Sequence, residues 1–348
     1  MFSYLSVYCI VCVFFVLGEK YQRYFCFFIG LFILWLFGGL RYGVGLDYNG
    51  YWDIFLYTDS TGVELGYRQL CLFFRSMGFG PQIMYLVSTA LTLSLIYKAV
   101  SFYNRSQVAF AFVIFLFAGF YTESFNISRQ YIAIGFFIYA TRYIFLHSFG
   151  KYLLIILIGS LFHSSILFML PFYWLLDLKY SDSVVLVGIL LSVGIAYTLP
   201  LDGLYEKIPF YGRYMLEDSR FNVNAGLGLG YMSKVLIALL LLKLRHCIIA
   251  IDNKYNVVIN GFFFYILFMA VFKDFMVLLR IAYYFHIFLI LLLPRMVYCF
   301  NRKSQKIFLA ASYLYLSMLF IIQITDKTAM LIPYRINLDL TTTVNLNQ

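Results

Sequence analysis

Long apolar runs recur along this chain, and they constrain its fold more than any other feature of the sequence. The runs are about 17 to 25 residues long, which lets a helix cross about 30 Å of hydrocarbon. Inside lipid the backbone must satisfy its own hydrogen bonds, which leaves only helices or a closed barrel. Continuous rather than alternating apolar runs favour helices. The sequence therefore predicts an all-α polytopic transmembrane helix bundle.

The composition excludes an ordinary soluble domain. The 348 residues are 63% hydrophobic, 21% aromatic and only 12% charged. A net charge of +10 would suggest a nucleic-acid partner, but Lys and Arg fall in short clusters between the apolar runs, where membrane topology explains them better. We therefore predict no nucleic acid as a partner. The cysteines lie mostly in or beside the runs, which predicts packing residues rather than a disulfide framework.

We expect about 11 to 12 spans in a single integral membrane domain over residues 1–348. The positive-inside rule places the short basic turns in the cytoplasm, so the connections 41–80 and 201–228 and the tail 325–348 face outward. Residues 152–176 cross either once as a tilted helix or twice as a hairpin of short helices, and the hairpin is preferred because it keeps the later basic turns inside. The predicted spans are 2–17, 24–40, 82–100, 107–122, 129–146, 152–176, 184–200, 229–244, 256–272, 277–297 and 306–324.

The segment 41–52 is the first place where ionisable groups stand at a membrane edge. A charge there is costly, about 2.5 to 3.5 kcal/mol at mid-bilayer and less near the interface, so it usually has a function. Glycines in the segment let backbone amides turn toward an anion, and with Arg41 they suit a phosphate. Asp47 is a candidate base or a partner that orients Arg41, while Tyr48 and Tyr51 offer flat faces to sugar rings. The alternative is an ordinary interfacial loop with an aromatic belt.

Three other side chains interrupt apolar sequence. Arg129 falls at the start of a predicted helix, where a cation opposes the helix dipole, so it needs an anionic partner, either Glu123 or a ligand phosphate. His163 is either a hydrogen-bonded structural residue or a general base, because histidine titrates near neutral pH. Arg280 either snorkels outward or faces the bundle interior and reaches an anionic ligand.

Several catalytic motifs are missing from the sequence. It has no Walker-type loop, no His-Glu-x-x-His, no nucleophile elbow and no Cys/His set with zinc spacing. ATP hydrolysis and metalloprotease chemistry are therefore excluded, and we predict no metal and no cofactor.

Six short polar motifs follow one another along the chain. They are Arg41-Tyr-Gly-Val-Gly-Leu-Asp47-Tyr48 with Tyr51, Glu64-Leu-Gly66-Tyr67, Asn126-Ile-Ser-Arg129-Gln130 with Ala133, Phe162-His163-Ser164-Ser165, Arg280 with Tyr284-Phe285, and Pro333-Tyr334. Their order resembles the EpsG-like branch of the Wzy polysaccharide polymerases, membrane proteins that extend O-antigen, capsule or exopolysaccharide chains. The resemblance covers most of the chain. Leucine precedes Asp47 where the family pattern often has threonine, and Ser165 replaces a frequent alanine, but neither departure removes a charged candidate.

The resemblance implies a glycosyltransferase of the bacterial inner membrane that polymerises undecaprenyl-diphosphate-linked oligosaccharide units on the outer face. A chain-length regulator protein is a candidate further partner. A flippase for the same lipid-linked units is the alternative. Loss of a diphosphate from an anomeric carbon needs cations on the departing phosphates and a base on the attacking hydroxyl. We assign the base to Asp47 or His163, and substrate binding to Arg41, Tyr48, Tyr51, Arg129, Gln130, Arg213, Arg220 and Arg280.

Overall fold

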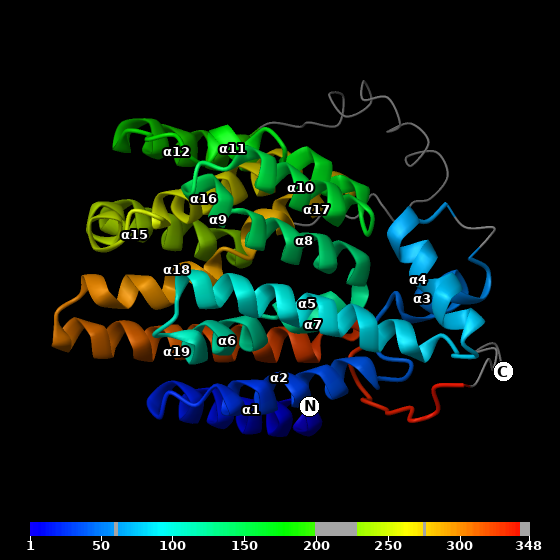
Figure 1. Cartoon of the computed structure of the whole chain (residues 1–348). Coiled ribbons are helices and arrows are strands. Elements are labelled where there is room, and N and C mark those ends of the chain that lie inside the picture. The colour runs from blue at the N-terminus through cyan, green and yellow to red at the C-terminus, as the bar shows by residue number, and fades with distance from the viewer. Residues whose placement is uncertain (59–61, 199–227, 274–275, 342–348) are drawn as a thin grey trace. The chain divides into compact units, whose positions relative to one another are not determined.

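The computed structural model describes residues 1–58, 62–198, 228–273 and 276–341 (Figure 1). Residue contacts divide the chain into two compact units. The first unit comprises Met1–Arg142, Phe149–Leu170 and Phe300–Gln348, and the second comprises Tyr143–Ser148 and Pro171–Cys299. A single membrane domain stays a prediction, because two compact units can belong to one domain.

Helices dominate both units, which confirms the all-α prediction. The described part of the chain contains no strand, only an isolated antiparallel bridge between Arg41 and Ile336. The helices of the first unit are α1 (Phe2–Lys20), α2 (Tyr24–Gly39), α3 (Tyr48–Leu56), α4 (Leu65–Ser76), α5 (Gln82–Tyr103), α6 (Val108–Phe117), α7 (Phe120–Asn126), α8 (Ser128–Ala140), α10 (Phe149–Ser160), the 3₁₀ helix η1 (Ser164–Met169), α19 (Arg302–Thr325) and the 3₁₀ helix η4 (Lys327–Ala329).

Four helical stretches in the described residues are long and apolar enough to cross a membrane, namely Phe2–Lys20, Gln82–Tyr103, Leu278–Cys299 and Arg302–Thr325. The pair α6 and α7, bent by 50° at a short break, makes a fifth if it is one span. The predicted 11 to 12 spans also counted shorter apolar helices. A 16-residue helix such as α2 is only about 24 Å long, which is less than the hydrocarbon thickness of about 30 Å.

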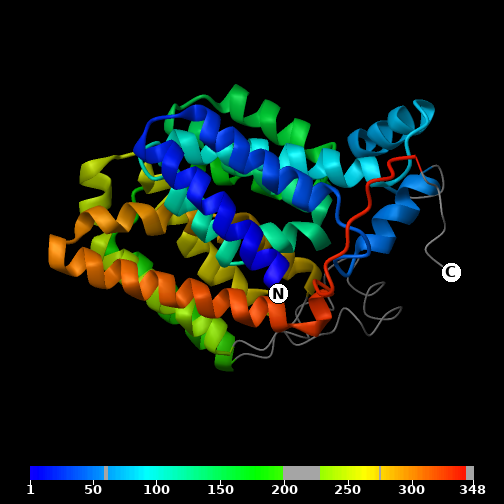
Figure 2. The same ribbon diagram turned by 90° about the horizontal axis from the view of Figure 1, so that it is seen from below.

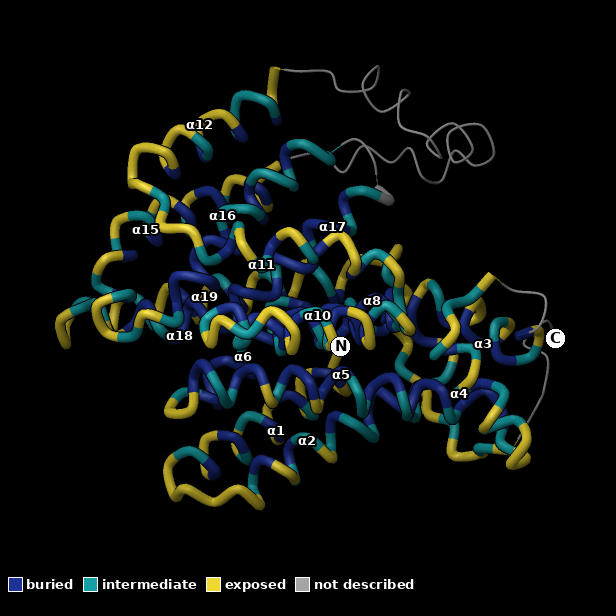
Figure 3. The backbone as a smooth tube through the Cα atoms, turned by 45° about the horizontal axis from the view of Figure 1, so that its top comes forward, coloured by how far each residue is buried: buried dark blue, intermediate teal, exposed yellow. Residues whose placement is uncertain are grey.

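Helix α5 is the centre of the first unit. It packs against α2 and α8, α1 packs against α2 and α6, and α19 packs against α6. Figure 1 shows α1, α2, α5, α6 and α19 running alongside one another. Along α1 and α2 exposed residues alternate with buried ones, whereas α5 is mostly buried (Figure 3). The outer helices thus leave large apolar side chains exposed, as expected for a membrane protein.

The segment after α10 turns back on itself. Helix α10 ends at Ser160, and η1 then packs against it. The hydroxyl of Tyr152 near the start of α10 donates a 2.6 Å hydrogen bond to the carbonyl of Met169 at the end of η1. Residues 152–169 therefore form a hairpin whose tip contains His163, in agreement with the short-helix hairpin predicted within 152–176. Two crossings of the membrane by this segment stay a prediction.

The C-terminal segment ties one end of the first unit together. After η4 it runs past the end of α2 toward α4, as the red trace in Figure 2 shows. The amide of Tyr42 donates to the carbonyl of Arg335, and the amide of Asn337 donates to the carbonyl of Leu40, both at 2.9 Å. The ring of Tyr334 stacks on Phe37 with centroids 4.1 Å apart.

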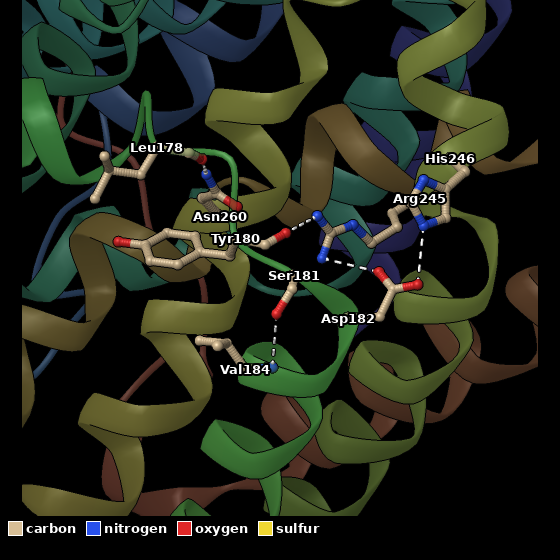
Figure 4. A network of polar contacts seen from close by, with 8 residues as sticks. All are labelled: Leu178, Tyr180, Ser181, Asp182, Val184, Arg245, His246 and Asn260. Atoms are coloured by element: carbon tan, nitrogen blue, oxygen red, sulfur yellow. Dashed lines mark hydrogen bonds and ion pairs between the residues drawn. The ribbon is translucent and has the colours of Figure 1, made fainter.

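The second unit is built around a cluster of phenylalanines from α11 and its neighbours. Figure 4 shows a polar network there, in which Asp182 pairs with Arg245 at 3.2 Å and with His246 at 2.9 Å. Cys247 and Cys299 form a disulfide, so the prediction that the cysteines only pack was wrong for this pair. The helices are α9 (Arg142–Phe145), which begins on the last residue of the first unit, α11 (Phe172–Leu175), α12 (Asp182–Thr198), α15 (Leu229–Ile251), α16 (Tyr255–Val271), α17 (Met276–His286), α18 (Leu289–Met296) and the 3₁₀ helix η3 (Val297–Cys299).

Candidate active site

The carboxylate of Glu64 is the centre of a polar cluster in the first unit. One oxygen, Oε2, forms an ion pair with the guanidinium of Arg129. The other oxygen, Oε1, lies 3.1 Å from Nδ1 of His163 and accepts a 3.1 Å hydrogen bond from the amide of Ser164. Three segments far apart in the sequence therefore meet at one side chain. We call Glu64, Arg129 and His163 the Glu64 cluster.

Two mutual caps bring these segments together. The first amides of α4, from Gly66 and Tyr67, donate to the carbonyl of Leu161 at the hairpin tip, at 2.8 and 3.1 Å. In return the side chain of Glu64, which directly precedes α4, accepts a hydrogen bond from the amide of Ser164, the first residue of η1. Helix ends leave such groups without intrahelical partners, so each segment completes the other. A Cβ atom at position 66 would lie 2.8 Å from the Leu161 carbonyl oxygen, so this close approach requires glycine.

The charge of the cluster follows from these contacts. Burial alone would raise the pKa of Glu64, but the hydrogen bond from His163 and the charge of Arg129 outweigh it and lower the pKa to about 2. The carboxylate is therefore ionised at neutral pH, so it accepts hydrogen bonds and donates none. Since it accepts from Nδ1, the neutral His163 ring has its lone pair on Nε2.

The cluster is accessible without being fully exposed. The exposed side-chain fractions are 16% for Glu64, 23% for Arg129 and 25% for His163. Arg129 uses one terminal nitrogen for Glu64, and its guanidinium lies 5.9 Å from the centroid of the Tyr67 ring. A half-buried arginine beside a histidine with an open Nε2 offers a cation and a base to the same ligand.

A comparison with protein families assigns the chain to a family. The model of the EpsG family matches residues 23–336, which is nearly the whole chain. The chain belongs to the EpsG family. No curated protein and no solved structure matches it. Membership supports a role in polysaccharide polymerisation at a membrane and confirms the resemblance seen in the motifs. Three of those motifs, those with Glu64, Arg129 and His163, meet in the Glu64 cluster.

Arg41, the arginine of the segment 41–52, has a different environment. Its side chain is buried, with 1% of the residue exposed. The guanidinium donates to the carbonyls of Gly38 and Phe125 and lies over the ring of Tyr85 at 4.7 Å and that of Phe125 at 4.4 Å. It also donates to the hydroxyl of Ser128 at 3.4 Å. This burial does not support the prediction that Arg41 binds a phosphate, because the backbone and two aromatic faces already surround the guanidinium.

The glycines of the same loop also serve the protein itself. The amide of Gly45 donates to the carbonyl of Met330, and that of Leu46 donates to the side chain of Asn126. Gly45 has a φ of +104°, in the left-handed region that favours glycine. The prediction that the glycine amides of this loop turn toward an anion is not supported at Gly45, whose amide already has a protein acceptor. It stays a prediction for Gly43 and Gly50.

The aromatic residues after this loop are core residues. Tyr48 stacks on Tyr85 with centroids 4.5 Å apart, and its hydroxyl donates to Gln82 at 3.1 Å. Tyr48, Tyr51 and Trp52 are all buried, in a hydrophobic cluster formed by α3, α4 and the start of α5. Sugar stacking on Tyr48 and Tyr51 is therefore not supported, because the two rings are already covered by the protein.

The remaining predicted residues have other positions. Asp47 is partly exposed and directly precedes α3, and Gln130 is buried. Arg280 is partly exposed on α17 in the second unit. Their assigned roles stay predictions. Arg213 and Arg220 lie outside the described residues. Within the described ranges, no three His, Cys, Asp or Glu side chains gather as a metal site.

Glu64 is the residue whose importance the sequence did not reveal. Arg129 was expected to need an anionic partner, but Glu123 lay nearer in the sequence. In the structure the partner is Glu64, while Glu123 accepts a hydrogen bond from the hydroxyl of Tyr131 at 2.5 Å. The available signal was that Glu64 belongs to one of the short motifs of the resemblance.

Proposed function

We propose that this EpsG-family protein is a glycosyltransferase of the bacterial inner membrane that joins oligosaccharide units linked to undecaprenyl diphosphate. The observation that carries the proposal is the Glu64 cluster, which puts the open Nε2 of His163 beside the half-buried guanidinium of Arg129. The reaction needs one base and at least one cation for the leaving diphosphate. A flippase would need the cation but not the base.

The proposed step is a displacement at the anomeric carbon of the donor sugar. A hydroxyl of the incoming unit forms the new carbon–oxygen bond, and the bond between the anomeric carbon and the diphosphate oxygen breaks. The hydroxyl proton passes to Nε2 of His163, and the diphosphate leaves with the electron pair of the broken bond. Arg129 neutralises the charge on the departing phosphate with donors that its single bond to Glu64 does not use. Asp47 remains the alternative base.

An outward position of the site is supported by the distribution of charge in the first unit. The side-chain amide of Gln82 at the start of α5 donates to the carbonyl of Gly39 at the end of α2. The hydroxyl of Tyr103 near the end of α5 lies 3.1 Å from that of Thr141 just after α8. Arg129 in the first turn of α8 therefore lies at the end of the bundle opposite to a set of basic turns. Short basic turns face the cytoplasm. The basic residues at or near these turns are Lys20, Arg23, Lys98, Arg105 and Arg142.

Chain extension by the purified protein tests the proposal. The protein in lipid vesicles is mixed with undecaprenyl-diphosphate-linked oligosaccharide, and the chain length of the product is measured by gel electrophoresis. We expect a ladder of longer chains and release of undecaprenyl diphosphate. Units that cross the vesicle membrane with unchanged length would support the flippase instead, and units that neither move nor grow would contradict both.

A further inference from the structure

We infer that Glu64 is a positioning residue that holds the base and the cation of this site in one fixed arrangement. Its two carboxylate oxygens have separate partners, Oε1 binding His163 and Ser164 and Oε2 binding Arg129. The contacts themselves are independent of the reaction, whereas their catalytic consequence rests on the proposed function. Nothing in the sequence motifs assigns this role to Glu64.

The first part of the argument concerns the protonation of His163. A neutral imidazole carries its proton on either Nδ1 or Nε2, and the partner of one nitrogen decides which. Oε1 of Glu64 already accepts from the amide of Ser164, which can only donate. An oxygen of an ionised carboxylate 3.1 Å from Nδ1 must accept from that nitrogen as well. Glu64 therefore keeps the proton on Nδ1 and the lone pair on Nε2.

The second part concerns rigidity. Glu64 directly precedes α4, whose first amides bind the carbonyl of Leu161, two residues before His163. The carboxylate and the imidazole are therefore attached to two segments that are themselves joined by hydrogen bonds. A partner fixed in this way orients the ring with little loss of side-chain entropy, which is what a positioned base needs.

The third part concerns Arg129. Oε2 faces a guanidinium, which has only donors, while Oε1 faces two donors. A glutamine at position 64 has one acceptor oxygen and one amide nitrogen. The oxygen is expected to remain with Ser164 and His163, because it satisfies two donors there, and the amide nitrogen would then face Arg129. Glu64→Gln thus removes the contact with Arg129 and keeps the contact with His163, whereas Glu64→Ala removes both contacts.

Nitrogen NMR of the four histidines tests the inference without a substrate. The full-length protein, with ¹⁵N-labelled histidine and in lipid, is measured at about pH 8.5, above the ordinary titration range of histidine. The signals that disappear in His163→Gln belong to His163. We expect the neutral His163 ring to carry its proton on Nδ1 in the wild type and in Glu64→Gln. In Glu64→Ala the ring should be a mixture of the Nδ1–H and Nε2–H tautomers. His147, His246 and His286 serve as internal controls, and Glu123→Gln is the matched control carboxylate.

The outcomes separate this inference from the proposed function. A proton on Nε2 of His163 in the wild type, or spectra of His163 that are the same in Glu64→Ala and the wild type, would overturn the positioning role even if the protein polymerises sugars. The expected spectra from a protein that extends no chains would support the positioning role and leave the proposed function without support. With both intact, Glu64→Gln should slow chain extension because Arg129 loses its anionic partner, and Glu64→Ala should slow it further, since only the second also releases the base.

Discussion

Two arginines of the first unit, Arg41 and Arg129, show how differently one protein can use a cation. Arg41 is buried between two aromatic rings and donates to two backbone carbonyls and one hydroxyl. Arg129 is 23% exposed and pairs with one carboxylate, Glu64, which is shared with His163. The arrangement at Arg41 joins segments of the chain. The arrangement at Arg129 leaves guanidinium donors that a ligand can use.

The difference between the two arginines lies in their partners rather than in their position along the chain. Backbone carbonyls and ring faces stabilise a cation without a second charge. A carboxylate that also binds a histidine provides an electrostatic arrangement typical of an active site. We therefore expect changes at Arg41 to affect mainly stability, and changes in the Glu64 cluster to affect mainly activity.

The largest effect is expected at His163. His163→Gln removes the base but keeps a polar side chain, so chain extension should fall by about 10²- to 10⁴-fold, the usual contribution of general-base catalysis. The thermal unfolding midpoint in detergent should change little, because the side chain is partly exposed. Activity within a factor of about two of the wild type would show that His163 is not the base and would favour Asp47.

A pair of matched substitutions separates the two arginines. Arg41→Met keeps the length of the side chain but leaves buried carbonyls without a donor, at a cost of about 1 to 3 kcal/mol for each group. We expect its unfolding midpoint in detergent to fall sharply. Arg129→Met should change the midpoint far less and should reduce chain extension per folded molecule. The reverse pattern would contradict the separation of roles.

The pH dependence of stability gives a third test. The pKa of Glu64 is lowered to about 2, so its pairing stabilises the fold at pH values above the ordinary pKa of the carboxyl group, near 4.5. This contribution is lost as the pH falls from about 4.5 toward about 2. Wild-type unfolding midpoints measured from pH 6 to pH 2.5 in about half-unit steps should drop more steeply than those of Glu64→Gln. Parallel curves would contradict the native ion pair.

A smaller effect is expected from the close contact at the hairpin tip. Gly66→Ala places a Cβ atom 2.7 Å from that of Leu161, so the tip must shift away from α4. We expect about 1 kcal/mol of destabilisation and a clear fall in chain extension, because a small misplacement of a catalytic group is costly. Gly50→Ala is the control, since a Cβ atom there meets nothing within 4 Å. Equal activity of the two variants would show that the tip position is unimportant.

The sequence predicted the helical membrane fold because apolar length alone nearly determines it. The break at His163 was also predictable, since polar residues interrupt an apolar run there. The number of full-length spans was harder to predict, because helices such as α2 and α16 are apolar but short, with 16 and 17 residues. Hydropathy does not separate a short buried helix from a complete crossing.

The site was only partly predictable for a related reason. Arg129 and His163 could be selected because each disturbs a local pattern, but their common partner is 65 and 99 residues away in the sequence. Only the packing of α4 against the hairpin tip reveals it. The rings of Tyr48 and Tyr51 looked available for sugars, yet both are buried in the cluster that α3, α4 and the start of α5 form. Local composition does not show which face of a short helix becomes covered.

Photo-crosslinking of the lipid-linked substrate is the most direct test of the Glu64 cluster as the active site. A photoreactive amino acid replaces the exposed Ser164, next to His163, and in a second protein it replaces the exposed Tyr24 at the opposite end of the unit. With undecaprenyl-diphosphate-linked oligosaccharide present, light should attach the substrate at position 164, and Arg129→Met in the same protein should reduce the yield. Equal capture at both positions, or capture at position 24 alone, would contradict the account.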